Sequence, residues 1–371
     1  MHHFAKTICL LFCGVALAAA EVPKLKAGFY VDRGSRSGGT LRWAQFLHYS
    51  PQFDVTLLDG QDLRNGKLDG LDLLVIPGGS SELQCKAMGE EGKAAVRRFV
   101  ASGGKYIGIC AGYHCALNSP GRIGLLPFAW MGSAGITTLK VELFDNAEKR
   151  LDIPKGSYMA AYSRGPIARF APIEGDTPAT AEVLGVYHSS FGPAGKPEIN
   201  YSGTPAMLFG TYGKGKVIAT SFHPELRKGT WPIAFGCVYA VTGVKPTPQF
   251  PAKTPRPVRV GYYSPTIVGK RCIREVLDLD RERGIELSFV SDADLKKREL
   301  KDLDVMVFSD GVEEAYRSLA SRRKIIERFM ARGGKVLASG NGAEHLPRHR
   351  NLTILPVGTS FVEAALAARK K

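Results

Sequence analysis

The chain has 371 residues, a formal net charge of +15 and 44% hydrophobic residues. This length exceeds what one ordinary core organises, so we expect two domains of about 100–200 residues each. Lysine and arginine are scattered along the chain and do not alternate with aromatic residues in one basic stretch, which argues against nucleic acid as a partner. We expect most of these charges on solvated faces.

The first twenty residues have the pattern of an export signal. A weakly basic start, MHHFAK, precedes the apolar run TICLLFCGVALA, and Ala18 and Ala20 occupy the −3 and −1 positions of a cleavage site before Glu21. The run is too short for a membrane anchor, and no later segment approaches the roughly 20 apolar residues of a membrane span. We therefore predict a signal peptide at residues 1–20 and a periplasmic or secreted mature protein.

Residues 21–244 are predicted to form the first domain. The runs LDLLVIP (71–77) and KYIGI (105–109) are apolar without alternation, which is typical of strands buried on both faces of a parallel sheet. Between them, EGKAAVRRFVASGG (91–104) has helical spacing and ends in two glycines. This order predicts a doubly wound, mostly parallel α/β sheet of the flavodoxin-like type, with ligands at the carboxyl ends of the strands.

A cysteine between small residues follows the KYIGI run directly, in the sequence GICAG (108–112). A nucleophile at a sharp strand-to-helix turn needs such neighbours, because the chain doubles back there. The positive end of the next helix favours the thiolate of Cys110, and the N–H of Ala111 points the same way. The loop VIPGGSSE (75–82) offers Gly78 and Gly79 for a second oxyanion donor. The alternative is that Cys110 is a small, buried core residue.

A base and its orienting acid are offered by the sequence GKGKVIATSFHPEL (213–226). His223 and Glu225 are two residues apart, so on an extended backbone their side chains project to the same side. The alternative is a surface turn that happens to contain a histidine. Residues 132–200, which precede this run, are expected to be irregular and to shape a substrate cap, with Tyr162, Ser163 and Arg164 near its mouth.

These motifs together resemble the class I glutamine-amidotransferase-like superfamily. The segments GICAGYHCA, YSRGPIARF and YGKGKVIATSFHPE look most like its branch named for the N-terminal domain of some biotin-protein ligases, and the resemblance covers about residues 24–243. It implies Cys110 as nucleophile, His223 as base and Glu225 as orienting acid. It also implies an oxyanion hole made by the N–H groups of Gly79 and Ala111.

The sequence departs from the family pattern at one position of the expected pocket. Glutaminases of this superfamily usually have glutamine four residues after the nucleophile, where this chain has His114, so glutamine is not the predicted substrate. Gly78, Tyr113 and His114 are predicted to contact the substrate, although Tyr113 and His114 also suit packing under the neighbouring loop. No biotin-ligase catalytic domain and no ammonia-accepting domain is recognisable in the sequence.

The proline-rich stretch KPTPQFPAKTPRP (245–257) is predicted to be a linker, and residues 258–371 echo the first domain. For example, AAVRRFVASGGKYIGICAG is echoed by KIIERFMARGGKVLASGNG, which aligns Gly103 with Gly333 and Cys110 with Gly340. We therefore predict an internal duplication whose second copy is degenerate and lacks the nucleophile. That copy is expected either to pack on the first or to form a homodimer.

Five cysteines remain beyond the predicted signal. Their spacing matches no zinc site, and we expect neither a metal nor another cofactor. Their odd number leaves at least one thiol unpaired in an oxidising compartment. Cys85 follows the glycine loop and is expected to approach either Cys110, which would silence the nucleophile, or Cys115. The five are Cys85, Cys110, Cys115, Cys237 and Cys272.

Two functions fit these observations. The first is an exported cysteine hydrolase that cleaves an amide-type C–N bond of a small molecule or peptide through a thioester intermediate. The second is a non-catalytic protein that binds a small molecule or peptide on the same fold, since a fold alone specifies no activity. Neither requires nucleic acid or a membrane span.

Overall fold

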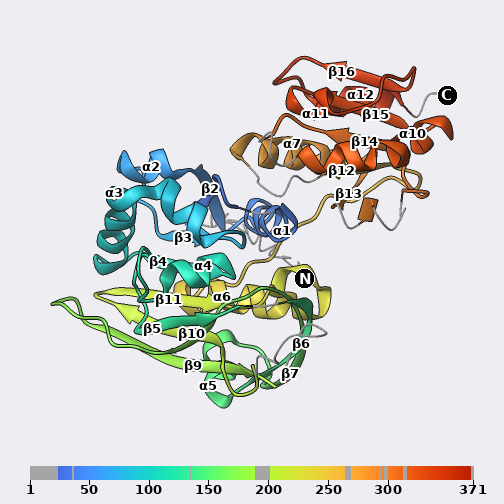
Figure 1. Cartoon of the computed structure of the whole chain (residues 1–371). Coiled ribbons are helices and arrows are strands. Elements are labelled where there is room, and N and C mark those ends of the chain that lie inside the picture. Colours follow the sequence, from blue (N-terminus) through green and yellow to red (C-terminus); the bar gives the residue numbers. More distant parts are fainter. Residues whose placement is uncertain are drawn as a thin grey trace, which may run out of the picture.

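The computed structural model describes residues 24–35, 37–133, 135–188, 201–263, 269–291, 294–295, 300–311 and 316–368. The predicted signal peptide lies outside these residues. Within them the chain forms a nine-stranded, a five-stranded and a two-stranded sheet (Figure 1). None of the helices in these ranges is long and apolar enough to cross a membrane.

Half of the nine-stranded sheet is parallel. In hydrogen-bonding order its strands are β2 (Phe53–Leu58), β1 (Leu25–Tyr30), β3 (Leu73–Ile76), β4 (Lys105–Ile109) and β11 (Gly215–Thr220). The short apolar strands β3 and β4 are almost completely buried, as expected for strands that are covered on both faces. The predicted doubly wound α/β fold is confirmed.

Helices cover both faces of this parallel half. One face is covered by α1 (Ser37–His48) and α6 (Trp231–Thr242). The other is covered by α2 (Gly60–Arg64), α3 (Ser81–Ala101) and α4 (Ala111–Ala116). Successive residues of β3 alternate between the two cores, so that Val75 packs with α1 and α6 whereas Leu74 packs with α3 and α4.

The other half of this sheet is antiparallel and corrects one expectation. Beyond β11 it continues through β10 (Pro205–Tyr212), β9 (Ala179–Tyr187), β6 (Ile136–Leu143) and β7 (Gly156–Ser163). Residues 132–200 are therefore not irregular where they are described. These strands are buried on one face only, so polar residues alternate with inward-facing ones such as Val141 and Leu143. The segment therefore lacks the continuous apolar runs that mark β3 and β4 in the sequence.

Three smaller elements complete this part of the chain. Helix α5 (Asp145–Leu151) connects β6 to β7. The strands β5 (Phe128–Gly132) and β8 (Ile167–Phe170) form the separate two-stranded antiparallel sheet. β5 follows α4 in the chain and β8 follows β7, and Trp130 of β5 lines the same cavity as Cys110, which comes directly after β4.

The five-stranded sheet is entirely parallel and forms its own lobe, coloured orange to red in Figure 1. Its strands, in order, are β13 (Ile285–Val290), β12 (Val258–Tyr263), β14 (Val305–Phe308), β15 (Lys335–Ser339) and β16 (Leu352–Leu355). The first four repeat the order of β2, β1, β3 and β4. Its helices include α7 (Lys270–Arg281), α10 (Arg323–Ala331), α11 (Asn341–Glu344) and α12 (Phe361–Ala367).

Corresponding turns of the two sheets have the same backbone shape. Gly103 and Gly333 precede β4 and β15 with φ angles of 119° and 96°. After these strands, Cys110 and Gly340 have φ angles of 52° and 48°. The residues that the sequence aligns thus have similar backbone conformations in the two sheets, and the internal duplication stays a prediction.

In the second sheet, the side chain of Asp310 occupies the space at the corresponding turn. The N–H of Asn341, which corresponds to that of Ala111, donates to Asp310 Oδ1 at 3.0 Å. A Cβ atom on Gly340 would lie only 2.3 Å from the same oxygen. The Asp310 carboxylate therefore fills the space that a nucleophile and its oxyanion would need.

The two sheets are joined by polar contacts between α1 and α7. Gln45 Nε2 and Tyr49 Oη donate hydrogen bonds to Asp280 Oδ2 at 2.6 and 2.9 Å. The proline-rich segment 245–257 has no helix or strand, and its Phe250 packs against Phe46 and other aromatic rings of the first core. The segment is thus held against the protein.

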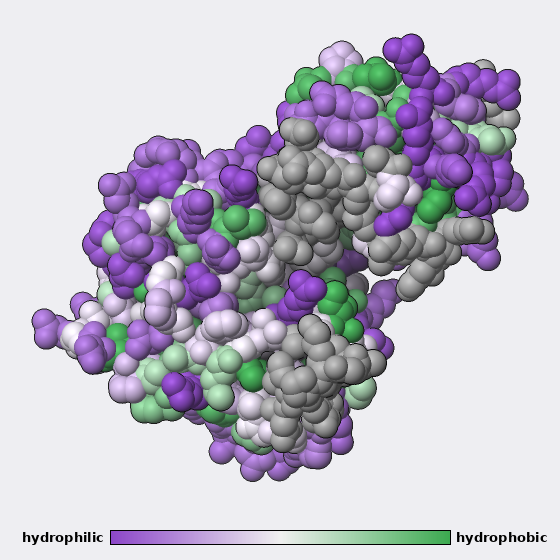
Figure 2. Space-filling view, viewed as in Figure 1, coloured by the Kyte–Doolittle hydropathy of each residue, from purple (hydrophilic) through white to green (hydrophobic). Residues whose placement is uncertain are grey.

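Hydrophilic residues dominate the face of the molecule shown in Figure 2, and hydrophobic residues appear there in small scattered groups. The larger exposed hydrophobic side chains include Trp130 and Met131 of β5. The distribution on this face agrees with the expectation that most charges are solvated.

We predict that Asp280→Ala lowers the free energy of unfolding by about 1–3 kcal/mol, because it leaves the buried polar groups of Gln45 and Tyr49 without their acceptor. Guanidinium denaturation followed by tryptophan fluorescence measures this. Asp278→Ala, on the same helix but with a side chain 57% exposed, is the matched control and should change little. Equal effects of the two variants would contradict the assignment.

Candidate active site

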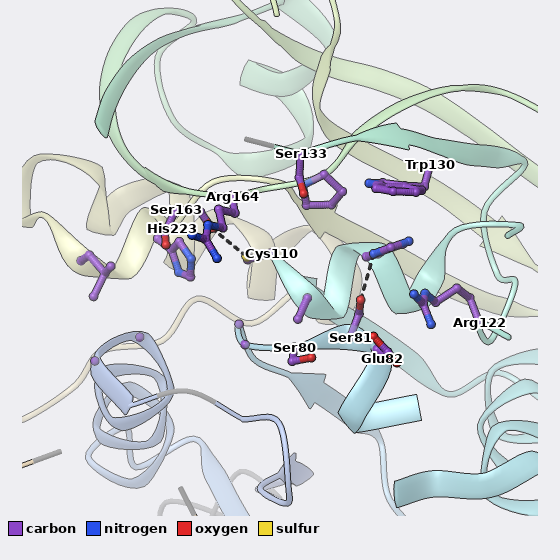
Figure 3. A pocket seen from close by; sticks show the side chains of 18 residues that line it. Ser80, Ser81, Glu82, Cys110, Arg122, Trp130, Ser133, Ser163, Arg164 and His223 are labelled. Carbon is purple, nitrogen blue, oxygen red and sulfur yellow. Dashed lines mark hydrogen bonds between the residues drawn. The ribbon is translucent and has the colours of Figure 1, made fainter. Parts of the chain in front are cut away.

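A cavity of about 490 Å³ lies at the carboxyl ends of β3 and β4 (Figure 3). This is the edge at which a doubly wound sheet binds ligands. Its walls come from the loop after β3, the turn after β4, α1, β5 and the turns after β7 and β11. The lining residues include Gly39, Gly78, Gly79, Cys110, Ala111, His114, Arg122, Trp130, Ser163, Arg164 and His223.

Cys110 occupies a sharp turn between β4 and α4, as the GICAG sequence predicts. Its backbone has φ 52° and ψ −98°, a conformation that side-chain-bearing residues rarely adopt. Small neighbours are required, because a Cβ on Gly112 would lie 2.0 Å from the carbonyl oxygen of Ile76. The turn is held by a hydrogen bond of 2.7 Å from the Cys110 N–H to the Thr220 carbonyl.

The thiol of Cys110 faces the cavity from this turn. It is 5% exposed, and Sγ lies 3.6 Å from the carbonyl oxygen of Ser163 (Figure 3). The first residue of α4, Ala111, also lines the cavity.

His223 and Glu225 form a buried pair immediately after β11. His223 Nδ1 lies 2.8 Å from Glu225 Oε1, and the side chains are 10% and 0% exposed. The two residues do not lie on an extended backbone, as the sequence argument assumed. Residues Pro224–Leu226 form a 3₁₀ turn instead, and this turn brings the carboxylate under the imidazole.

The protonation of His223 depends on its two neighbours. Burial alone disfavours the imidazolium, but the Glu225 carboxylate and Cys110 raise the pKa of His223 well above its usual value. Because Nδ1 faces Glu225, the other ring nitrogen is available to exchange a proton with Cys110. Gly78 permits their approach, since a Cβ there would lie 2.5 Å from His223 Cε1 and 3.4 Å from Cys110 Cβ.

The two backbone N–H groups predicted to form the oxyanion hole come from residues at the N-termini of α3 and α4. Gly79 has a φ of 151°, in the region that favours glycine, and it is followed by Ser80, which caps α3. Ala111 begins α4. Gly78, Gly79 and Ala111 all line the cavity, so the structure brings the predicted loop and the predicted turn to one place.

Comparisons with known proteins show the superfamily to which the chain belongs. The family model described as "Biotin-protein ligase, N terminal" matches residues 39–119. The phosphoribosylformylglycinamidine synthase subunit PurQ of Rhodopseudomonas palustris (strain BisB18) is 31% identical over 175 residues, which cover 42% of this chain and 71% of that protein. The chain belongs to the class I glutamine-amidotransferase-like superfamily.

Further relatives in this superfamily match less of their length or less closely in sequence. PurQ of Rhodospirillum rubrum is 34% identical over 105 residues, which cover 27% of this chain and 42% of that one. Among solved structures, a ThuA-like protein from Bacteroides uniformis is 16% identical with a TM-score of 0.44, over 63% of this chain and 99% of that chain. PurLQS from Thermotoga maritima is 20% identical with a TM-score of 0.39, over 58% and 98%.

His114 stands where glutaminases of this superfamily usually have glutamine, and it lines the cavity. Its Nδ1 lies 2.9 Å from Ser81 Oγ, and its ring stacks on Trp130 at 5.3 Å with an interplanar angle of 25°. Burial and the nearby Arg122 guanidinium lower the pKa of His114 to about 4. At neutral pH the imidazole is therefore uncharged, with one ring nitrogen as a hydrogen-bond donor and the other as an acceptor.

Tyr113 was expected to contact the substrate, and the structure does not place it there. Its side chain is fully buried, and its hydroxyl faces the carbonyl oxygen of Pro205 at 3.5 Å. Consecutive residues of a helix point about 100° apart, and here His114 lines the cavity whereas Tyr113 points into the core.

Of the three residues expected near the mouth of the substrate cap, two line the cavity and one does not. Ser163 and Arg164 line the cavity, whereas Tyr162 is buried and donates to the Gly165 carbonyl at 2.6 Å. Arg164 has a φ of 50°, so its position is fixed by a backbone that is unfavourable for a side-chain-bearing residue.

Several lining residues were not indicated by the sequence. Trp130 and Arg122 come from the segment after α4, and Gly39 comes from the start of α1. The adjacent glycines Gly38 and Gly39 are the sequence signal for this part of the site. Residue 39 must be glycine, because a Cβ there would lie 2.0 Å from Glu225 Oε1. Within the described ranges, no three His, Cys, Asp or Glu side chains are grouped so as to hold a metal ion.

Gly39→Ala is predicted to displace the Glu225 carboxylate and to slow alkylation of Cys110 by iodoacetamide at pH 6 by roughly tenfold or more. Gly38→Ala is the matched control, because a Cβ there meets only Leu226 Cδ2, at 3.6 Å. Mass spectrometry of the peptide containing Cys110 gives both rates. If the two variants react equally fast, Gly39 is not what makes room for the carboxylate.

Proposed function

We propose that this protein is a cysteine-dependent amidase that cleaves an amide-type C–N bond through a thioester intermediate. The observation that carries the proposal is the buried His223–Glu225 pair beside a thiol held at a sharp strand-to-helix turn. An imidazole oriented by a carboxylate and placed against a thiol is the arrangement that activates a nucleophilic cysteine.

The residues have complementary roles in this reaction. The Cys110 thiolate attacks the carbonyl carbon, and the N–H groups of Gly79 and Ala111 stabilise the resulting oxyanion. The His223 imidazolium, oriented by Glu225, donates its proton to the departing nitrogen as the C–N bond breaks. A thioester remains. Neutral His223 then takes a proton from water, which attacks the thioester and releases the acid and the free thiolate.

The predicted substrate is the amide of a small molecule or peptide. The PurQ relatives are subunits of a synthase in a superfamily of glutamine amidotransferases, so amide cleavage is the shared chemistry. In place of the glutamine that is usual four residues after the nucleophile, the cavity has the His114 imidazole, which stacks on Trp130. The cavity therefore favours an amide whose neighbouring group stacks on a ring, and Gly78 lines it beside Cys110 and His223.

Water is the proposed acceptor of the acyl group. Residues 258–371 are proposed to be a degenerate copy of residues 21–244, joined by the segment 245–257, and Asp310 fills the place of a second active site. Export through the signal at residues 1–20 is also part of the proposal. Edman sequencing of the protein from the periplasm or medium, with Glu21 as the first residue, tests it.

The pH dependence of alkylation is the first test of the activated thiol. With a raised His223 pKa, the imidazolium persists at neutral pH and keeps Cys110 as a thiolate, so the rate with iodoacetamide should change little between pH 7 and 6. In His223→Ala it should fall about tenfold over the same interval, as for a free thiol. His188→Ala, an exposed histidine paired with Glu142, is the control. A tenfold fall in the wild type would sink the proposal.

Turnover distinguishes the amidase from the binding protein. We expect a panel of aryl and peptide amides, with L-glutamine included, to contain a substrate whose hydrolysis falls at least about 100-fold in Cys110→Ser and in His223→Ala. Ammonia or amine release measures the rate. Ligand affinity that is unchanged in Cys110→Ala, together with no hydrolysis by the wild type, would favour the non-catalytic binding protein instead.

A further inference from the structure

Two cysteines outside the proposed mechanism lie in contact with each other. Cys85 Sγ and Cys115 Sγ are 3.4 Å apart, and the two residues are 3% and 0% exposed. Cys85 is on α3 and Cys115 is on α4, so the contact joins two different helices. Of the two partners that the sequence allowed for Cys85, the structure therefore brings it to Cys115 and not to Cys110.

The surroundings of the two sulfurs differ. Cys115 Sγ lies 3.6 Å from Gln84 Oε1 and 3.9 Å from the Ser81 carbonyl oxygen. The cations that act on Cys85 are Arg122, which also lines the active-site cavity and acts on Cys115 as well, and Lys93, whose ammonium donates to Glu90 at 2.6 Å and to the Gly121 carbonyl at 3.1 Å. Such charges stabilise a thiolate, and Lys93 acts on Cys85 in addition to the shared Arg122.

The contact between the two sulfurs shifts the pKa values of the two thiols in opposite directions. The contact with Cys115 lowers the pKa of Cys85 against the effect of burial, and Arg122 and Lys93 lower it further. The same contact with Cys85, together with burial, raises the pKa of Cys115 well above its usual value. One sulfur is thus prepared to attack, and the other is left to complete the exchange.

We propose that Cys85 and Cys115 form a dithiol site that closes to a disulfide by exchange with a low-molecular-weight disulfide. The Cys85 thiolate attacks one sulfur of the reagent, forms a mixed disulfide and expels the first thiolate. Cys115 then loses its proton, attacks Cys85 Sγ and expels the second thiolate. The two protein thiols are oxidised by two electrons, and the reagent is reduced to two thiols that carry the two protons.

The change in geometry is small. A disulfide bond is about 2.05 Å long, so the sulfurs must approach by roughly 1.4 Å from their present contact. Helix α3 is interrupted at Gly89, which has a φ of 67°, and Cys85 lies in the short piece before this interruption. That piece can shift towards α4 without moving the rest of the helix.

The position of the site relates it to the proposed active site. Cys85 lies five residues after Ser80, the cap of α3, and Cys115 lies five residues after Cys110, the cap of α4. The disulfide would fix the distance between the two helices that begin at the oxyanion donors. Its formation does not require Cys110, so it can be tested whether or not the amidase proposal holds.

The test is incubation of the native full chain with oxidised glutathione, followed by denaturation, alkylation with N-ethylmaleimide and peptide mapping. We expect one linked pair of peptides that contains Cys85 and Cys115, and the loss of their two N-ethylmaleimide adducts. Cys110→Ala should leave this result unchanged. Cys237→Ser is the matched control and should also leave it unchanged, because this buried thiol lies in the core on the other face of the sheet, with α1 and α6.

Three outcomes would overturn the proposal. They are full alkylation of Cys85 and Cys115 after incubation, a stable glutathione adduct on Cys85, and a linked pair that contains Cys110. A second measurement does not rely on mapping. Oxidation should raise the thermal midpoint of the wild type by about 5 °C and leave those of Cys85→Ser and Cys115→Ser unchanged. An unchanged thermal midpoint of the wild type after oxidation would contradict a disulfide between α3 and α4.

Discussion

The left-handed turn at Cys110 is the constraint around which the site is built. A side-chain-bearing residue in this conformation costs about 1–3 kcal/mol, and the surrounding contacts must hold it in place. Tyr106 from β4 donates to the Gly112 carbonyl at 2.7 Å, and the neighbouring strand β11 accepts the Cys110 N–H. His223 follows three residues after the end of β11, and its N–H donates to the carbonyl of Ala161 in β7 at 2.8 Å. Hydrogen bonds to strands of one sheet therefore fix the positions of Cys110 and His223 relative to each other.

The second sheet shows what this turn becomes without a thiol. Gly340 keeps the left-handed backbone at no steric cost, and the Asp310 carboxylate enters the space where a side chain at 340 would stand. Arg271 pairs with that carboxylate, so the charge is neutralised inside the lobe. A cysteine placed at 340 alone would clash with Asp310. A side chain at this turn and the carboxylate in its present position therefore exclude each other.

Much of the site could be predicted because its signals are local. The GICAG turn, the Pro-Gly-Gly loop and the His-Pro-Glu segment each need particular residues within five positions, and the sequence shows them directly. Tyr113 was misplaced because the direction of a side chain on a six-residue helix depends on where the helix begins. Gly39 was missed because its requirement for glycine comes from Glu225, which is remote in sequence. The strands within 132–200 were missed because their exposed faces are polar and small.

Helix α1 connects the second sheet to this site by rigid contacts. Its first turn contains Gly39, which packs directly on the Glu225 carboxylate, and its far end carries Gln45, which donates to Asp280 of α7. Twelve residues of helix span about 18 Å and bend little over that length. Because the carboxylate that orients His223 lies against one end and the second lobe holds the other, the orientation of α1 is fixed from both sides. A lobe without a nucleophile therefore still contributes to the geometry of the nucleophile's base.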